Sequence, residues 1–213
     1  ADLAELWRDA VSRFPSLWDI VAQAEPVRPF AAAGPLRRLW SEASGAGWGM
    51  LPTTAGFVDP LHSTGIAHSV HGVARIADLL LADRCDDPAW LAYGRAVTDE
   101  VRWIDQLVSL AYATMTEPRL FRAACTLFFL ATIRFEQAAT AGSPLHSLGF
   151  LAADDMPLRT ALGSQRQRLL QAAAGRVSVE HTLAELRHAL ASWDTAGLFN
   201  PAAANRFAHT APR

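Results

Sequence analysis

Apolar side chains recur every three or four residues along most of the chain, the spacing that places them on one face of an α-helix. Proline at position 118 fits this pattern because a proline in the first turn of a helix breaks no hydrogen bond. The periodicity predicts helices over residues 2–14, 16–24, 66–82, 88–114, 118–140, 157–174 and 178–193.

The pattern changes over residues 26–51, where prolines and glycines interrupt the apolar positions. Two short runs, "PLRRLWSEA" and "GWGML", lie on either side of "SGAG". Short runs separated by a glycine-rich turn are typical of a β-hairpin or a pair of strands. The sequence therefore predicts a mainly α fold with a small β element.

The passage "MLPTTAGFVDPLHSTGIAH" connects the proline- and glycine-rich stretch to the helical region that follows it. Pro52, Gly56 and Pro60 prevent a strand at "GWGML" from continuing directly into a helix, so the chain must loop before a helix that begins near Gly65. The first amides of a helix lack partners within that helix, and the helix dipole places positive charge at the same point. The passage is suited to an anion or to the electron-rich edge of a reduced cofactor ring.

Composition narrows the class of protein. The 213 residues suffice for one core, or for one domain with an appendage. A formal net charge of -2 provides no basic field for nucleic acid, and the most apolar run, residues 123–133, is about half of the ~20 residues that a membrane span requires. All 19 basic residues are arginine, so no lysine can serve as base or nucleophile.

Cysteine usage points to a reducing compartment. Cys85 and Cys125 are far apart, and neither has a second cysteine at metal-site or disulfide-motif spacing. We expect a cytoplasmic location, no bound metal and no structural disulfide. The chain opens without a signal-peptide pattern, and its first residue is Ala rather than Met, so we expect that an N-terminal portion precedes it.

The stretch "TAGFVDPLHSTG" resembles the second flavin-binding segment of FAD-dependent oxidoreductases of the flavin-dependent (tryptophan) halogenase and geranylgeranyl reductase-like group. Gly56, Phe57, Asp59 and Pro60 match that group's Gly/Cys-Phe-x-Asp/Glu-Pro, and residues 63–65 match its Ser-Thr-Gly. The resemblance implies that FAD is the cofactor and that the main chain of Ser63, Thr64, Gly65 and Ile66 contacts the isoalloxazine.

Two positions depart from the group's pattern. Where the resemblance implies a Gly-Asp or Gly-Asn pair, this chain has Pro52 and Thr53, whose hydroxyl can donate one weaker bond to the flavin. Tryptophan halogenases carry a glutamate directly before Ser-Thr-Gly, whereas this chain has His62, our candidate catalytic residue, which can act as acid or base near neutral pH. The resemblance also implies that the Thr64–Gly65 backbone would hold chloride if halogenation occurs.

The resemblance covers the C-terminal part of such an enzyme. The Gly-x-Gly-x-x-Gly fingerprint, the catalytic lysine and the Trp-x-Trp segment would all precede residue 1. We expect a C-terminal fragment of an α+β FAD-binding oxidoreductase that lacks its N-terminal Rossmann-type half and is inactive without it. Residues 1–65 would end the FAD and substrate region, and residues 66–213 would form a helical C-terminal region.

The expected function is that of a monooxygenase or halogenase-like FAD-dependent oxidoreductase. Two alternatives are a geranylgeranyl reductase-type double-bond reductase and a non-catalytic helical interaction module with a vestigial flavin loop. The expected partners are a small aromatic or apolar substrate, and either the missing FAD-binding half or a flavin reductase. If a missing half packs on this chain, an apolar face should be exposed where it docks.

The remaining polar and aromatic residues receive structural interpretations. His68 and His71 are expected to be solvated or at the edge of the core, and Glu100, Arg102 and Asp105 to form an exposed helix face. Helical spacing makes Trp90, Trp103 and Trp193 packing residues, whereas Trp40 and Trp48 are expected either to pair across the hairpin or to line a substrate cavity.

Overall fold

The computed structural model describes residues 2–34, 36–81 and 86–200. The chain divides into two compact units, residues 1–36 and residues 37–213. Cys85 and most of the C-terminal tail lie outside the described residues. The functional division that we expect at residue 65 stays a prediction.

The first unit contains two short helices, α1 (Leu3–Ser12) and α2 (Pro15–Val21). The Asp2 carboxylate caps α1 by accepting a hydrogen bond from the Ala4 amide at 2.9 Å. The rings of Trp7 and Phe30 lie 5.5 Å apart, so the segment after α2 folds back onto α1. Neither helix contains a buried residue.

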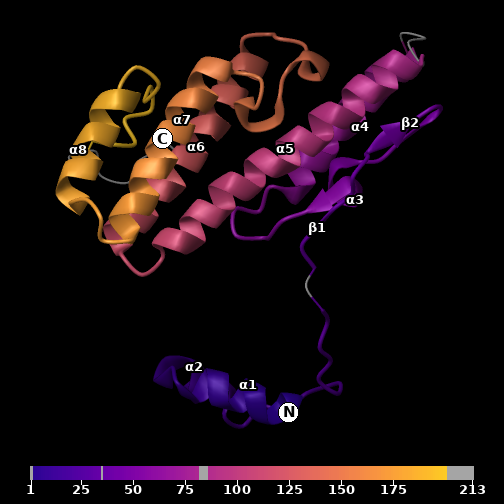
Figure 1. The fold of residues 1–213 in the computed structure, drawn as a ribbon. Helices are drawn as coiled ribbons and strands as arrows, with labels where there is room; N and C mark the ends of the chain where they lie inside the picture. Colours follow the sequence, from indigo (N-terminus) through magenta and orange to yellow (C-terminus); the bar gives the residue numbers. More distant parts are fainter. Residues whose placement is uncertain (1, 35, 82–85, 201–213) are drawn as a thin grey trace, which may run out of the picture. The chain divides into compact units, whose positions relative to one another are not determined.

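The second unit is helical and holds the main core. Helices α5 (Asp87–Thr114), α6 (Pro118–Thr140), α7 (Met156–Ala173) and α8 (Val179–Leu190) pack together (Figure 1). Two 3₁₀ helices, η1 (Leu145–Ser147) and η2 (Phe150–Ala152), lie between α6 and α7. The interior is filled by large side chains under 2% exposed, among them Trp103, Leu107, Leu127, Leu169 and Leu190. The predicted helix-rich architecture is confirmed.

The β element is smaller than the sequence predicted, and its pairing differs. Strand β2 (Ser44–Gly45) pairs antiparallel with β3 (Trp48–Gly49) around a turn in which Gly47 has φ +73°. The hairpin is therefore present. However, β1 (Arg38–Leu39), from the first predicted run, pairs with β4 (Gly56–Phe57) rather than with "GWGML".

A short helix, α3 (Pro52–Ala55), lies where the sequence analysis expected only loop. Pro52 was expected to keep the strand at "GWGML" from continuing directly into a helix, but it occupies the first turn of α3, where proline is favoured. Its ring packs directly on α4 (Gly65–Leu81), because a Cβ added at Gly72 would lie 2.3 Å from Pro52 Cδ. Glycine at position 72 thus lets α3 approach α4 closely.

Helix α4 is polar toward the interior and apolar toward solvent. His68, His71 and Arg75 are 3%, 4% and 7% exposed, so the expectation that the two histidines are solvated or at the core edge was wrong. The apolar stripe predicted on the same helix faces away from the core. Its exposed fractions are 82% for Ile66, 63% for Val70, 50% for Val73 and 86% for Leu81. We call these four residues the outer face of α4.

Candidate functional site

The loop between β4 and α4 is held by Asp59. Its carboxylate Oδ1 accepts a hydrogen bond from the Leu61 amide at 2.8 Å, which forms a local turn. The Tyr112 hydroxyl on α5 donates to the same oxygen at 3.0 Å, and this hydrogen bond raises the pKa of Tyr112. Asp59 therefore both shapes the loop and ties it to α5.

The chain enters α4 through an unusual backbone conformation at Ser63. Its φ is +53°, in the left-handed region that non-glycine residues seldom adopt, and its amide donates to the Pro60 carbonyl at 2.9 Å. The first bond into α4 runs from the His68 amide to the Thr64 carbonyl at 2.9 Å. The amides of residues 65–67 precede that bond and are available to a ligand.

The predicted segment surrounds one small pocket of about 230 Å³. The pocket is also lined by Val58, His68, Val101 and Ile104, which the sequence analysis did not assign to it. Every residue predicted to bind the cofactor is part of its lining: Thr53, Gly56, Phe57, Asp59, Pro60, Ser63, Thr64, Gly65 and Ile66. We call this the loop pocket.

Close packing fixes two walls of the loop pocket. A Cβ at Gly56 would lie 2.6 Å from Val101 Cγ1, so only glycine lets β4 approach α5 this closely. The Thr53 hydroxyl lies 2.6 Å from that of Ser69, and the Arg38 guanidinium donates to the Thr53 carbonyl at 2.9 Å. The Thr53 hydroxyl is thus already engaged with α4.

His62 does not line the loop pocket. Its ring stacks on Phe128 of α6 with centroids 4.0 Å apart, and its buried Nε2 has no hydrogen-bond partner among the described residues. Burial lowers the pKa of His62, while the charge of Asp59 acts in the opposite direction. The catalytic role of His62 stays a prediction, and it would require the ring to leave Phe128.

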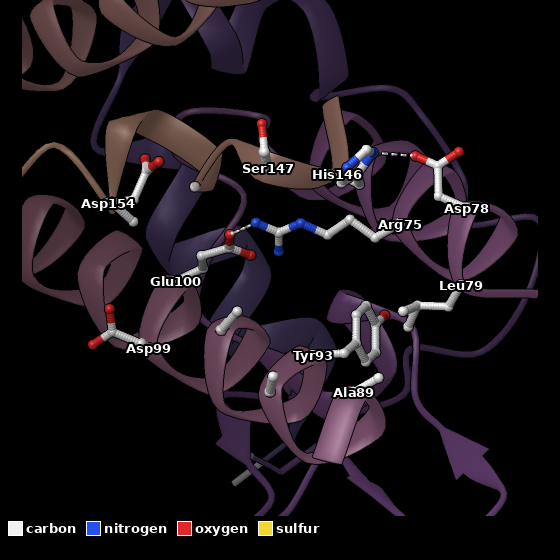
Figure 2. Close-up of a pocket in the computed structure, with 14 residues that line it drawn as sticks. Arg75, Asp78, Leu79, Ala89, Tyr93, Asp99, Glu100, His146, Ser147 and Asp154 are labelled. Carbon is white, nitrogen blue, oxygen red and sulfur yellow. Dashed lines mark hydrogen bonds and ion pairs between the residues drawn. The ribbon is translucent and has the colours of Figure 1, made fainter. Parts of the chain in front are cut away.

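A buried polar cluster lies directly behind the loop pocket. Glu100 of α5 accepts hydrogen bonds from His68 Nε2 at 2.9 Å and from the Phe150 amide at 2.8 Å, and it forms an ion pair with Arg75 Nη2 at 2.8 Å (Figure 2). Only 2% of Glu100 is exposed, so its expected place on an exposed helix face was wrong. Arg102 is exposed as expected.

The charge state of Glu100 follows from this surrounding. Burial alone would raise its pKa, but the hydrogen bond from His68, the charge of Arg75 and the Phe150 amide outweigh burial, and the net pKa is lowered. A sequence signal for this cluster does exist. His68, His71 and Arg75 are spaced three and four residues apart, which gives α4 a polar stripe as regular as its apolar one.

Within residues 2–34, 36–81 and 86–200, no three or more His, Cys, Asp or Glu side chains gather where they could hold a metal ion. None of the described helices combines the length and the apolar character needed to cross a membrane.

The family model described as tryptophan halogenase matches residues 9–125, more than half of the chain. The chain therefore belongs to the tryptophan halogenase family. No curated protein matches the chain.

Solved structures of a halogenase have a fold similar to that of this chain. The crystal structure of halogenase PltM superposes with a TM-score of 0.73 at 18% sequence identity, over 92% of this chain and 44% of that one. The complex of PltM with phloroglucinol and FAD superposes with a TM-score of 0.72 at 18% identity and the same coverage. This chain thus spans less than half the length of the halogenase it resembles.

Proposed function

We propose that this chain supplies the isoalloxazine-contacting part of an FAD-dependent oxidoreductase of the halogenase type. One observation carries the proposal. The residues that the flavin-segment resemblance assigns to the cofactor, although spread over residues 53–66, all line the loop pocket at the N-terminal end of α4. FAD would supply the two-electron chemistry, and this chain would bind and polarise the ring.

The donors in the loop pocket fit a flavin ring. The amides of Gly65 and Ile66 precede the first bond of α4, so they and the positive end of the helix dipole would stabilise negative charge on a reduced isoalloxazine. A volume of about 230 Å³ matches part of the ring system rather than a whole dinucleotide. The ADP portion of FAD would therefore be held elsewhere.

As the specific reaction of this oxidoreductase we propose halogenation. The Thr64–Gly65 backbone would then also hold chloride, and His62 would serve as acid or base toward a small aromatic or apolar substrate. Halogenase PltM has been crystallised with phloroglucinol, a small aromatic compound, which supports this substrate class. Family membership favours the halogenase branch over the reductase alternative.

We further propose that an N-terminal FAD-binding half covers the outer face of α4. Ile66 connects the two features, since it lines the loop pocket and is also the first residue of the outer face. A half that packs along this face would bring the rest of the cofactor to the loop pocket. Without it the 213-residue chain should be inactive, and a flavin reductase would be the electron donor.

Titration of the purified chain with lumiflavin, the isolated ring system, tests the proposal directly. We expect saturable fluorescence quenching by the chain, competition by FAD and none by ADP. Gly65→Pro should abolish the quenching, because proline fits the first turn of α4 but removes an amide donor. Gly65→Ala is the matched control, since its Cβ would lie 3.4 Å from Thr53 Cγ2, an ordinary contact.

Two results would overturn the proposal. One is equal quenching by the wild-type and Gly65→Pro chains, which would place the flavin elsewhere. The other is the absence of any quenching, both by the chain alone and after addition of the N-terminal half of a halogenase of this family.

A further inference from the structure

His62 occupies a tight turn within the segment that lines the loop pocket. The Ser63 amide donates to the Pro60 carbonyl at 2.9 Å, which makes His62 one of the two central residues of a four-residue turn. Pro60 and Ser63, the ends of this turn, both line the loop pocket, whereas His62 does not. The imidazole is therefore carried by the wall of the pocket, but its ring is directed elsewhere.

The ring of His62 lies in surroundings that suit only its neutral form. It stacks on Phe128 with centroids 4.0 Å apart and meets Phe129 edge-on at 6.4 Å, and its Nε2 is buried without a hydrogen-bond partner among the described residues. A neutral imidazole can keep its proton on Nδ1, so that only an acceptor is left unpaired. An imidazolium would instead bury a charged donor at Nε2 without an acceptor, which costs much more.

An acceptor of the opposite charge lies three residues earlier, at Asp59. Its Oδ1 is occupied, because it accepts from the Leu61 amide at 2.8 Å and from the Tyr112 hydroxyl at 3.0 Å. Its Oδ2 makes no hydrogen bond or ion pair within residues 2–34, 36–81 and 86–200. Asp59 itself lines the loop pocket. A carboxylate oxygen with spare acceptor capacity is therefore present at the pocket.

The charges around His62 leave Asp59 as the group that an imidazolium would approach. Burial lowers the pKa of His62, and the charge of Asp59 raises it by less. From α6 the ring meets Phe128 and Phe129, which carry no charge. From α5 the nearest titratable group is Tyr112, whose pKa is raised by its hydrogen bond to Asp59, so that it stays neutral.

We propose that His62 has two positions, stacked on Phe128 when it is neutral and hydrogen-bonded to Asp59 Oδ2 when it is protonated. The turn of residues 60–63 would carry the ring from one to the other, and no other part of the fold would need to move. The proposal rests on the proposed function of the loop pocket. It adds that His62 reaches the pocket only while it carries a proton, so that it would act there as an acid.

Asp59 would then be a positioning residue for this acid. The Leu61 amide and the Tyr112 hydroxyl fix its carboxylate through Oδ1, which leaves Oδ2 to hold one nitrogen of the imidazolium. The second N–H of the ring would remain for a ligand in the loop pocket. Phe128 would have the opposite role, because it keeps the neutral ring out of the pocket.

NMR of the 213-residue chain with ¹³C- and ¹⁵N-labelled histidine tests the movement without any flavin. The His62 signals are assigned by their loss in His62→Phe. At pH 7.5 we expect nuclear Overhauser effects (NOEs) between the rings of His62 and Phe128. These NOEs should disappear as His62 titrates, while the amide signals of α7 stay unchanged and show that the chain is still folded.

Two variants separate the partners of His62. Asp59→Asn keeps an oxygen for the Leu61 amide but removes the charge, so His62 should bind its proton about two- to fivefold more weakly. His62→Phe keeps an aromatic ring against Phe128 that cannot be protonated, so the amides of residues 60–65 should lose most of their response to pH. His181→Phe, at an exposed position of α8, is the control and should leave both results as in the wild type.

The two-position proposal is overturned if the NOEs between His62 and Phe128 persist in the protonated state, or if Asp59→Asn and the wild type titrate at the same pH. Lumiflavin separates this outcome from that of the proposed function. In its presence, the protonated ring of His62 should show NOEs to the flavin and the neutral ring none. Flavin that binds without these NOEs refutes delivery of the acid. Loss of the Phe128 NOEs in a chain that binds no lumiflavin would instead refute the flavin site and leave the movement established.

Discussion

Glu100 Oε2 lies 2.9 Å from His68 Nε2 in the interior of the fold, where the two side chains are 2% and 4% exposed. The other carboxylate oxygen pairs with Arg75, which is almost as deeply buried. Three ionisable side chains are therefore held together away from water. Such a cluster is stable only while all its members remain, because removing one leaves an uncompensated buried charge.

Neutralising Glu100 should destabilise the fold strongly. We expect Glu100→Gln to lower the free energy of unfolding by about 3 kcal/mol, since Arg75 would lose the one carboxylate that it pairs with in the described part of the chain. Adding Arg75→Met should recover part of this loss. Asp99→Asn, which breaks a more exposed pair with Arg159, should cost less than about 1 kcal/mol. Urea unfolding of the four proteins measures these differences, and equal costs for Glu100→Gln and Asp99→Asn would contradict the assigned role.

Acidification should destabilise the chain before any carboxylate titrates. Burial, aided by the charge of Arg75, lowers the pKa of His71 in the folded chain, and burial likewise lowers that of His62. In the unfolded chain both protonate near pH 6.5, so the unfolded state binds more protons below that pH. The stability is complete above pH 6.5 and is lost as the pH falls toward the lowered pKa values.

Urea unfolding between pH 7.5 and 5.5 measures this loss, with a slope of up to about 1.4 kcal/mol per pH unit for each group. His71→Gln should reduce the slope even if it also lowers the stability at pH 7.5. Replacement of His181, which is exposed on α8, is the control for the loss of a histidine side chain as such. A flat profile for the wild-type chain would show that neither histidine is buried in its neutral form.

The contact between α3 and α4 should tolerate no side chain at position 72. A methyl group there would lie 2.3 Å from the rigid ring of Pro52, so we expect Gly72→Ala to cost about 1 to 3 kcal/mol. Gly163→Ala is the matched control within α7, where nothing lies within 4 Å and the better helix propensity of alanine should add about 0.5 to 1 kcal/mol. The thermal unfolding temperature should therefore fall for Gly72→Ala and rise for Gly163→Ala. Shifts of the same sign would refute the close approach of α3 to α4.

The outer face of α4 should govern self-association of the isolated chain. Val70→Ser with Val73→Ser removes apolar groups that are 63% and 50% exposed, so the unfolding free energy should change by less than about 1 kcal/mol. Light scattering should show less association of this variant, because a contiguous apolar patch has been broken. Val177→Ser, the same change at a 39% exposed site between α7 and α8, should have no such effect. Unchanged association of the double variant would mean that another surface is adhesive.

The sequence was informative where a side chain's role follows from its own segment. Helical periodicity located the long helices, and the glycine-rich "SGAG" turn located the hairpin. The extent of the strands could not be obtained in this way. Strand β1 pairs with β4 across residues 40–55, and such pairing depends on tertiary packing against α5 rather than on either strand's own pattern.

The sequence predicted which segment forms the candidate site, but it did not predict which distant residues complete the pocket. The motif residues all line the loop pocket, yet Val101 and Ile104 reach it from α5, and no local pattern connects them to the loop. The burial of His68 and Glu100 was missed because each was judged alone. A charged residue is usually exposed, and here only a partner about thirty residues away in the chain makes its burial possible.

The difference between the polar inner face and the apolar outer face of α4 has a consequence for recombination within the family. Positions 66, 70, 73 and 81 present an apolar surface outward, while within the fold positions 68 and 75 pair with Glu100 and position 71 pairs with the Leu148 carbonyl. With the proposed N-terminal half packed on its outer face, α4 would belong to two layers at once, and its sequence would have to remain compatible with both. We expect chimeras that join this chain to the N-terminal half of a member of this family to fold together only when the outer face of α4 comes from the same parent as that half.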